Sequence, residues 1–446
     1  MRTRMLKPLL LVLLLLGNVA FAAPEKKAEA KMPAPAAVTA PPATAAAAPA
    51  PAASAPAETA ASTPEDGAPT GVSTAPYNDP ATPPEFIALA PGLPEIEAKS
   101  YLLVDFQSGD ELAGGNPGML VEPASITKLM TAYIIYQELG KGTVKLTDEV
   151  LVSEKAWKME GSRMFIELGK KIEFEKLLKG MIIQSGNDAA MALVEHVAGS
   201  EDAFVKRMND TAAQLGMKNT HFMNATGWPA QNHYTTARDI VKLAKALIND
   251  FPEWYKLDSE KEFSYNNIKQ QNRNKLLWRD PTVDGMKTGH TESAGFCLVA
   301  SAKRDNMRLI SVVLGTKSED ARADVSQKLL EYGYRTFETH KLYGAGSVLS
   351  SVRVWKGDKT EVPAGVTSDL FVSIPKGRYD QLKGGMQLDK GVDAPIKRGD
   401  ALGKIIISDQ EQGKVIKEIP LLALDDVEEG GWWRNIVDSI QKVFED

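Results

Sequence analysis

The sequence predicts an α+β fold over residues 94–340, with an antiparallel sheet and helices, followed by a small all-β domain over 341–426. In the first part, a strand-like hairpin precedes many helical runs, and strands then return. After about His340 the pattern changes to short β-type runs separated by Gly, Pro and Asp. An amphipathic helix over 427–446 ends the chain, whose 446 residues are enough for two domains with their own cores.

The N-terminus, residues 1–22, is typical of a secretory signal peptide. A basic start precedes an apolar run at 9–16, and the small-residue sequence Ala20-Phe21-Ala22 forms a cleavage site. The apolar run is too short to span a bilayer comfortably, so an uncleaved anchor is the less favoured alternative. We therefore expect the mature chain to be exported.

Residues 23–93 are dominated by Ala and Pro, as in PAPAAVTAPPATAAAAPAPAAS. Such a segment cannot bury enough apolar surface to offset the entropy cost of ordering it. We interpret it as a disordered, partly extended tether and not as a domain.

The charge argues against a nucleic-acid-binding protein, and the cysteine content excludes a fold stabilised by internal disulfides. The formal net charge of −6 argues against a nucleic-acid partner, because phosphate binding needs a basic surface. The single cysteine, Cys297, leaves no internal disulfide. It lies in the run GFCLVASA and is expected to be a small buried apolar residue.

The elements of the α+β domain follow from periodicity. The run YLLVDFQSGDELAGG alternates and turns at Ser108-Gly109, which predicts a β-hairpin. Apolar residues at helical spacing predict helices at about 125–140, 173–183, 187–198, 200–215, 235–249 and 319–338. Strand-like runs at 294–303 and 307–314 are expected to join the hairpin in one sheet.

The last segment, GGWWRNIVDSIQKVFED, separates completely into two sides when placed on a helix. The apolar side carries Trp432, Trp433, Ile436, Val437, Ile440, Val443 and Phe444. Adjacent tryptophans favour a membrane interface, so residues 430–446 are expected to attach the chain to a membrane surface. The polar side has more acids than bases, so this attachment would be hydrophobic; the alternative is that the helix packs on its own β domain.

Ser125 and Lys128, in PASITK, indicate nucleophilic chemistry. Side chains three residues apart share a face of a helix, so the two can meet at the helix N-terminus. A serine hydroxyl needs a nearby base, and a desolvated lysine with a lowered pKa can accept its proton. The alternative is a surface serine and lysine, since S-x-x-K alone is often a chance match.

Two further motifs strengthen this interpretation. Ser185-Gly186-Asn187 lies between helical runs, and Lys287-Thr288-Gly289 leads into the strand-like run AGFCLVASA. S-x-x-K, S-x-N and K-T-G, in this order, form the set of penicillin-binding proteins and class A β-lactamases. An edge strand after K-T-G would present backbone groups to an extended peptide.

Through PASITKLMT, QSGNDA, NRNKLLW, VDGMKTGHT and the terminal helix, the chain resembles D-alanyl-D-alanine carboxypeptidases of the low-molecular-mass penicillin-binding protein type over about 85–446. The resemblance implies a penicillin-binding/β-lactamase-like catalytic domain. It implies removal of the terminal D-alanine from peptidoglycan stem peptides ending in D-Ala-D-Ala, through an acyl-enzyme, with β-lactams as covalent inhibitors. It further implies peripheral attachment at the periplasmic face of the cytoplasmic membrane.

The resemblance also implies roles for the motif residues. Ser125 would be the acylated nucleophile and Lys128 its base. Ser185 and Asn187 would complete a proton relay and hold the substrate amide, and Lys287 would supply positive potential.

Further residues would bind the substrate. Thr288 and Gly289 would line its extended strand, and the backbone N–H groups of the nucleophile and of His290 would form an oxyanion hole. Arg273, in NRNKLLW, and Arg322, in EDARADV, resemble arginines near the terminal carboxylate. For both arginines a structural ion pair is the alternative.

Three other functions remain open on the same residues. A β-lactamase of class A would carry an E-x-x-L-N segment between Asn187 and Lys287, which this chain lacks, and its central motif residue is Gly186 instead of Asp. A DD-endopeptidase would use the same site. A catalytically silent peptidoglycan-binding protein would have no reason to keep all the motif residues.

No cofactor and no metal are expected. The histidines show no metal-ligand spacing with thiols or carboxylates; they are His196, His221, His233, His290 and His340.

Overall fold

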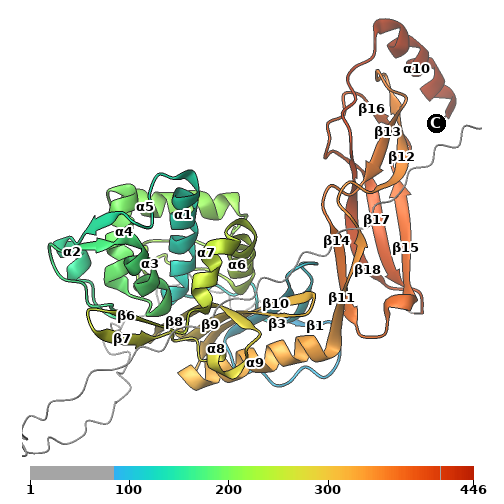
Figure 1. Ribbon diagram of the computed structural model, residues 1–446. Helices are drawn as coiled ribbons and strands as arrows, with labels where there is room; N and C mark the ends of the chain where they lie inside the picture. The colour runs from blue at the N-terminus through green and yellow to red at the C-terminus, as the bar shows by residue number, and fades with distance from the viewer. Residues whose placement is uncertain (1–84, 412, 446) are drawn as a thin grey trace, which may run out of the picture. The chain divides into compact units, whose positions relative to one another are not determined.

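The computed structural model describes residues 85–411 and 413–445 (Figure 1). The predicted signal peptide and most of the predicted tether lie outside these residues. Within them, no helix is both long and apolar enough to cross a membrane.

A six-stranded antiparallel sheet forms the centre of the first domain, in the order β1-β3-β2-β10-β9-β8. Its strands are β1 (Phe86–Ala88), β2 (Ser100–Asp105), β3 (Glu111–Gly115), β8 (Val283–Thr291), β9 (Gly295–Arg304) and β10 (Met307–Thr316). The predicted hairpin is β2–β3, and β10 pairs with β2, so the prediction that late strands join the early hairpin is confirmed. β1 falls inside the segment assigned to the tether, so the sheet begins earlier than expected.

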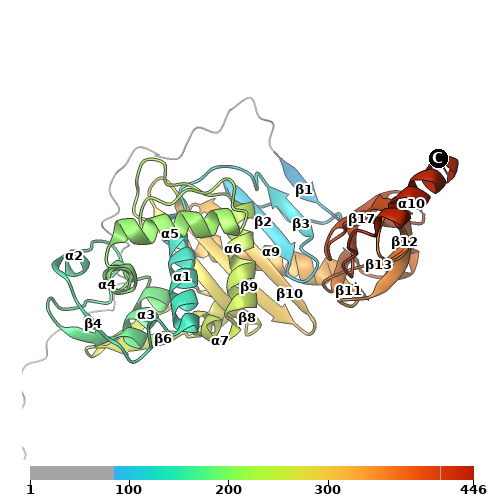
Figure 2. The ribbon, with the colours of Figure 1, turned by 90° about the horizontal axis from the view of Figure 1, so that it is seen from above.

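Helices cover both faces of this sheet (Figures 1 and 2). One face carries α1 (Lys128–Lys141), α3 (Phe174–Ile183), α4 (Asn187–Ala198), α5 (Glu201–Gln214) and α6 (Ala237–Asp250), and the other carries α9 (Glu319–Thr336). Alternation along β2 explains the two layers, because successive side chains of a strand point to opposite faces. Leu102 and Val104 join the core of the first group, whereas Leu103 joins the core with α9.

The sequence did not predict several short elements. These are α2 (Glu154–Trp157), α7 (Pro252–Tyr255), α8 (Leu276–Arg279) and the hairpins β4–β5 (Glu149–Leu151, Lys171–Glu173) and β6–β7 (Glu262–Tyr265, Ile268–Gln271). Segments of three or four residues are too short for a period to be visible.

The position of K-T-G needs a correction. Lys287, Thr288 and Gly289 do not precede the edge strand but lie within β8, which is itself the edge of the sheet. The following strand, β9, is interior, between β8 and β10. The sequence hid β8 because VDGMKTGHT contains two glycines and no alternation.

The second part of the chain is an all-β domain, as predicted. β11 (Phe337–Tyr343) pairs with β14 (Leu370–Pro375). A six-stranded sheet in the order β15-β17-β18-β13-β12-β16 consists of β12 (Val348–Trp355), β13 (Glu361–Gly365), β15 (Leu382–Leu388), β16 (Val392–Asp393), β17 (Ala401–Asp409) and β18 (Val415–Ala423). Its core includes Val352, Ile405 and Leu421.

The final segment forms the helix α10 (Trp432–Glu445). Its polar side faces the domain, because the buried Asp438 carboxylate accepts the backbone N–H of Lys356 at 2.6 Å. The side chains of Trp432 and Trp433 are 63% and 66% exposed, and Ile436 is 47% exposed. This part of the predicted apolar side is therefore not covered by the β domain.

Candidate active site

Ser125 lies in a 3₁₀ turn, η1 (Ala124–Thr127), that leads directly into α1. The preceding residue, Ala124, has a left-handed backbone with φ of 47°, which is unfavourable for a residue with a Cβ. The backbone of Gly227, with φ of 89°, lies so close that an added Cβ would be 1.8 Å from the Ala124 carbonyl oxygen. Close backbone packing thus fixes the turn that presents Ser125.

Lys128 is buried and connects three parts of the domain. Its Nζ lies 3.0 Å from Ser125 Oγ, 2.6 Å from Asn187 Oδ1 and 2.8 Å from the Thr226 carbonyl oxygen. The predicted meeting of Ser125 and Lys128 on one side of the helix start is present in the structure.

Burial lowers the pKa of Lys128 well below its usual value, and the nearby cations Lys287 and Arg273 lower it further, against Asp188. The contacts fit a neutral amine, which has two N–H donors and one lone pair. The donors are matched by Asn187 Oδ1 and the Thr226 carbonyl, so the lone pair can accept the hydroxyl hydrogen of Ser125.

Ser185 lies between α3 and α4, with a left-handed backbone at φ of 66°. Its Oγ accepts a hydrogen bond from Lys287 Nζ at 2.8 Å, and that nitrogen also donates to the Thr288 carbonyl at 3.0 Å. Both Ser185 and Lys287 are buried. The second and third motifs, 102 residues apart, therefore meet directly.

Asn187 opens α4 and holds a segment that we call the cleft loop, residues 160–166. Its side-chain Nδ2 donates to the Glu160 carbonyl at 2.7 Å, and its backbone N–H donates to the Ser162 carbonyl at 2.7 Å. Because its Oδ1 also accepts from Lys128, the amide has a fixed orientation.

Asp188 fixes the same loop with its buried carboxylate. The two oxygens accept backbone N–H groups from Met164 at 3.0 Å, Phe165 at 2.9 Å and Ile166 at 3.2 Å, and also from Ala189 at 2.8 Å. A carboxylate with several N–H donors is a strong anchor for backbone that has no regular partner. Asp188 was not predicted as a site residue, although an acid directly after S-x-N in a first helical turn was a visible signal.

The K-T-G strand lies against η1, the turn that carries Ser125. An added Cβ on Gly289 would be 3.2 Å from the backbone nitrogen of Ile126, so a larger residue would separate β8 from η1. The ring of His290 stacks on Phe296, with centroids 3.9 Å apart. As the edge of the sheet, β8 presents backbone groups toward the cleft.

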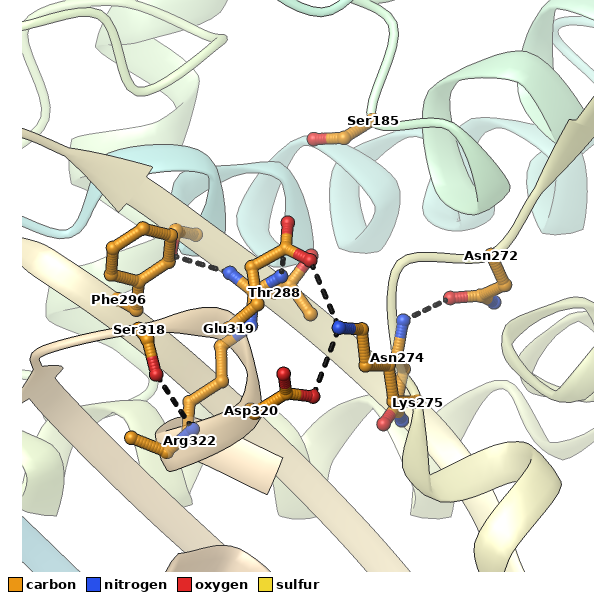
Figure 3. A network of polar contacts seen from close by, with 12 residues as sticks. Ser185, Asn272, Asn274, Lys275, Thr288, Phe296, Ser318, Glu319, Asp320 and Arg322 are labelled. Carbon is orange, nitrogen blue, oxygen red and sulfur yellow. Dashed lines mark hydrogen bonds and ion pairs between the residues drawn. The ribbon is translucent and has the colours of Figure 1, made fainter. Parts of the chain in front are cut away.

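The predicted arginines differ in exposure. Arg273 is half-buried and lines the cleft. Arg322 is 1% exposed, its Nη1 donates to the Gly289 carbonyl at 3.3 Å, and its Nη2 is 3.5 Å from Glu319 Oε1. Figure 3 shows Glu319 between Arg322 and Lys275, whose Nζ is 3.3 Å from Glu319. Arg322 therefore makes the ion pair given as its alternative and also contacts the K-T-G strand.

These residues surround a cleft of 1230 Å³ with Ser125 in its wall. One side is built from the cleft loop and β7, the other from β8 and α8. The residues that line the cleft include Ser125, Arg163, Phe165, Ser185, Asn187, Ile268, Gln270, Arg273, Thr288, Gly289 and His290. The described residues contain no cluster of histidine, cysteine and acidic side chains that fits a metal ion. Cys297 is buried in β9, as predicted.

A second buried acid, Asp258, lies in the 3₁₀ turn η2 (Lys256–Ser259) and packs against β8. An added Cβ on Gly285 would be 3.2 Å from the Asp258 Cβ. Burial raises the pKa of Asp258 to about 8; Lys287 opposes this rise and Asp284 adds to it. No pattern in the sequence places this residue next to K-T-G.

Comparisons with known proteins agree with the motifs. The family described as D-alanyl-D-alanine carboxypeptidase matches residues 87–318, and the C-terminal domain of penicillin-binding protein 5 matches residues 337–429. D-alanyl-D-alanine carboxypeptidase DacC of Escherichia coli is 44% identical over 359 residues, which cover 79% of this chain and 89% of that protein.

Solved structures give the same likeness. Penicillin binding protein 5 from Haemophilus influenzae is 43% identical, with a TM-score of 0.71, covering 75% of this chain and 99% of that one. Penicillin-binding protein D2 from Listeria monocytogenes, in its ampicillin-bound form, is 27% identical, with a TM-score of 0.51, covering 55% of this chain and all of that one.

We predict that Gly227→Ala lowers stability more than Gly169→Ala. Both glycines have positive φ, but an added Cβ at Gly169 meets nothing within 4 Å, whereas at Gly227 it strikes the Ala124 carbonyl. The backbone conformation alone costs roughly 1 kcal/mol, so thermal unfolding of the two variants isolates the clash. Equal losses in melting temperature would contradict the close packing of η1.

We predict that Asp258→Asn stabilises the protein increasingly as the pH rises from 4 to 8. The folded-state pKa is raised to about 8, so on raising the pH the unfolded chain ionises first and the acid costs folding free energy until about pH 8. Asparagine removes this cost, on the order of a few kcal/mol at pH 8. Chemical unfolding at several pH values measures the difference; a gain that does not depend on pH argues against a buried neutral acid.

Proposed function

We propose that Ser125 is the acylated nucleophile of this chain, which belongs to the D-alanyl-D-alanine carboxypeptidase family and is a serine-type D-alanyl-D-alanine carboxypeptidase. The contact of Ser125 Oγ with the buried Lys128 Nζ at 3.0 Å carries the proposal. No other base is needed, because burial already favours the neutral amine.

In the acylation step, Lys128 accepts the hydroxyl proton as Ser125 Oγ attacks the carbonyl carbon of the penultimate D-alanine. The carbonyl oxygen becomes an oxyanion, and the backbone N–H groups of Ser125 and His290 stabilise it. The tetrahedral species collapses when the C–N bond breaks. The leaving nitrogen takes up a proton and departs as D-alanine.

Ser185 supplies a route for that proton. Its hydroxyl is bonded to Lys287 Nζ, which holds the oxygen in place and adds positive charge beside the reacting bond. Asn187, whose amide is oriented by Lys128 and the Glu160 carbonyl, would bond the amide of the substrate's acyl part. In deacylation, water attacks the ester carbon while Lys128 accepts a proton from it. The bond to Ser125 Oγ then breaks, Lys128 returns the proton to that oxygen, and the shortened peptide leaves as a carboxylic acid.

The substrate's terminal strand is proposed to lie along β8. Its edge position leaves backbone groups for β-addition, and Gly289 lets β8 lie close to η1, which carries Ser125. Arg273 and Thr288 would bind the terminal carboxylate in the cleft. Arg322, buried against the Gly289 carbonyl, would position that strand and add positive charge.

We also propose that β-lactams acylate Ser125, since a relative of this chain is known in an ampicillin-bound form. The mature chain would act outside the cytoplasm, at a membrane surface. The exposed tryptophans of α10 support that attachment, because the helix meets its own domain with its polar side.

The function is tested by D-alanine release from a peptide ending in D-Ala-D-Ala. We expect release by the wild type and none above background by Ser125→Ala, with slow penicillin hydrolysis. Lys128→Ala should lower the acylation rate by about 10²–10⁴-fold, the range of general-base catalysis. Folding of both variants is checked by thermal unfolding. Fast penicillin hydrolysis without D-alanine release would instead indicate a β-lactamase, and normal penicillin labelling of Lys128→Ala would exclude the base role.

Membrane attachment is tested with Trp432→Ser/Trp433→Ser and uncharged phosphatidylcholine vesicles. We expect the wild type, without residues 1–22, to sediment with the vesicles at low and high salt, because the contact is hydrophobic. The double variant should partition at least about tenfold more weakly. Trp157→Ser, which changes an exposed tryptophan of α2, is the matched control. Equal sedimentation of all three proteins would place the attachment elsewhere.

A further inference from the structure

The cleft is basic although the whole chain has a net charge of −6. Of the described residues that line the cleft, only Glu319 has an acidic side chain. The basic side chains are Arg163, Lys269, Arg273, Lys275 and Arg279. Such a cleft attracts anionic ligands.

Most of these cations already have partners. Lys269 pairs with Glu262 at 2.8 Å, and Arg279 pairs with Asp324 at 2.6 Å. Lys275 pairs with Glu319, and Arg273 is proposed above to bind the terminal carboxylate.

Arg163 differs from them. The residue is exposed and lines the cleft, and its guanidinium lies over the ring of Phe165, 5.4 Å from the centroid. It makes no ion pair with any residue between 85 and 445 that the structure describes. Phe165 is itself 47% exposed and has a left-handed backbone, held by Asp188. The structure thus presents an aromatic ring and a cation on a rigid loop. This arrangement suits a carboxylate on an apolar stem.

Gln270, on β7, adds a second feature. The residue is 6% exposed and lines the cleft, and its Nε2 donates to the Arg163 carbonyl at 3.0 Å. Its Oε1 has no hydrogen-bond partner among the described residues. A buried acceptor without a donor costs free energy, which an N–H group of a bound peptide would recover.

The place of Arg163 indicates which part of the substrate it meets. The leaving D-alanine has one carboxylate, and Arg273 and Thr288 are the residues proposed to bind it. The loop that carries Arg163 is bonded twice to Asn187, which is proposed to hold the acyl part. A second anionic group recognised here would therefore belong to the acyl part.

We propose that Arg163, with Gln270 beside it, selects stem peptides that carry a free carboxylate on the acyl part, upstream of the scissile D-Ala-D-Ala bond. This inference rests on the proposed function. It makes Arg163 a specificity-determining residue, acting on kcat/KM through one charge-assisted contact.

Two synthetic peptides test the proposal. Both end in acetylated L-Lys-D-Ala-D-Ala preceded by γ-linked D-glutamate, whose α-carboxylate is free in one and amidated in the other. We expect the wild type to show at least a fivefold higher kcat/KM for the free acid at low salt. The ratio should fall in 0.5 M NaCl, since an exposed contact is screened.

Arg163→Gln should bring the ratio of acid to amide close to one, and Arg163→Lys should keep part of it. Because kcat/KM for the acid is divided by kcat/KM for the amide within each variant, a general loss of activity leaves this ratio unchanged. Lys170→Gln removes a charge from an exposed residue just after the cleft loop, and should keep the wild-type ratio. A ratio near one in the wild type, or an unchanged ratio in Arg163→Gln, would overturn the proposal.

Failure of the proposed function can be distinguished from failure of the Arg163 subsite, because the wild type would then release D-alanine from neither peptide. In that case, calorimetric binding of the two peptides to Ser125→Ala still tests the subsite. Tighter binding of the acid, lost in Ser125→Ala/Arg163→Gln, would support the subsite. Equal binding of acid and amide would reject it.

Discussion

The burial of one amine organises this active site. Lys128 Nζ has no solvent around it, so each of its hydrogen-bonding positions must be met by the protein. The groups that meet them come from the turn before α1, from the start of α4 and from the segment at Thr226, which are distant in sequence. The same burial that requires these contacts lowers the pKa of the amine and so favours its neutral form. The burial of Lys128 therefore accounts both for the contacts that hold the site together and for the lowered pKa of the amine.

The residues around Lys128 are held by backbone more than by side chains. Ala124 and Ser185 both have left-handed conformations that cost free energy in residues with a Cβ, and Gly227 and Gly289 allow contacts that a Cβ would prevent. Such strain persists only where the surroundings hold it in place. Here the helices packed above the sheet and the sheet beneath them provide that support (Figure 1).

Much of the site could be predicted from sequence because its chemistry is local. Ser125 and Lys128 are one helical turn apart, and the three motifs keep their order along the chain. The long helices were visible for the same reason, since their periodicity extends over many residues. Asp258 and Arg163 were not predicted, because their importance comes from neighbours that are far away in sequence, and the edge strand β8 carries glycines where a strand normally alternates. The role of Asp188 was missed although its position next to Asn187 was visible.

The open edge of β8 has a consequence for solubility. A free strand edge attracts the edges of other chains, and proteins commonly block this with charges that point inward or with neighbouring segments. Lys287 is an inward-facing charge in the middle of β8, and η1 lies against the same strand at Gly289. These features leave room for a single extended peptide but disfavour the sheet of another molecule. The side chain that is proposed to provide positive charge for catalysis thus also lies where an inward-facing charge disfavours edge-to-edge association.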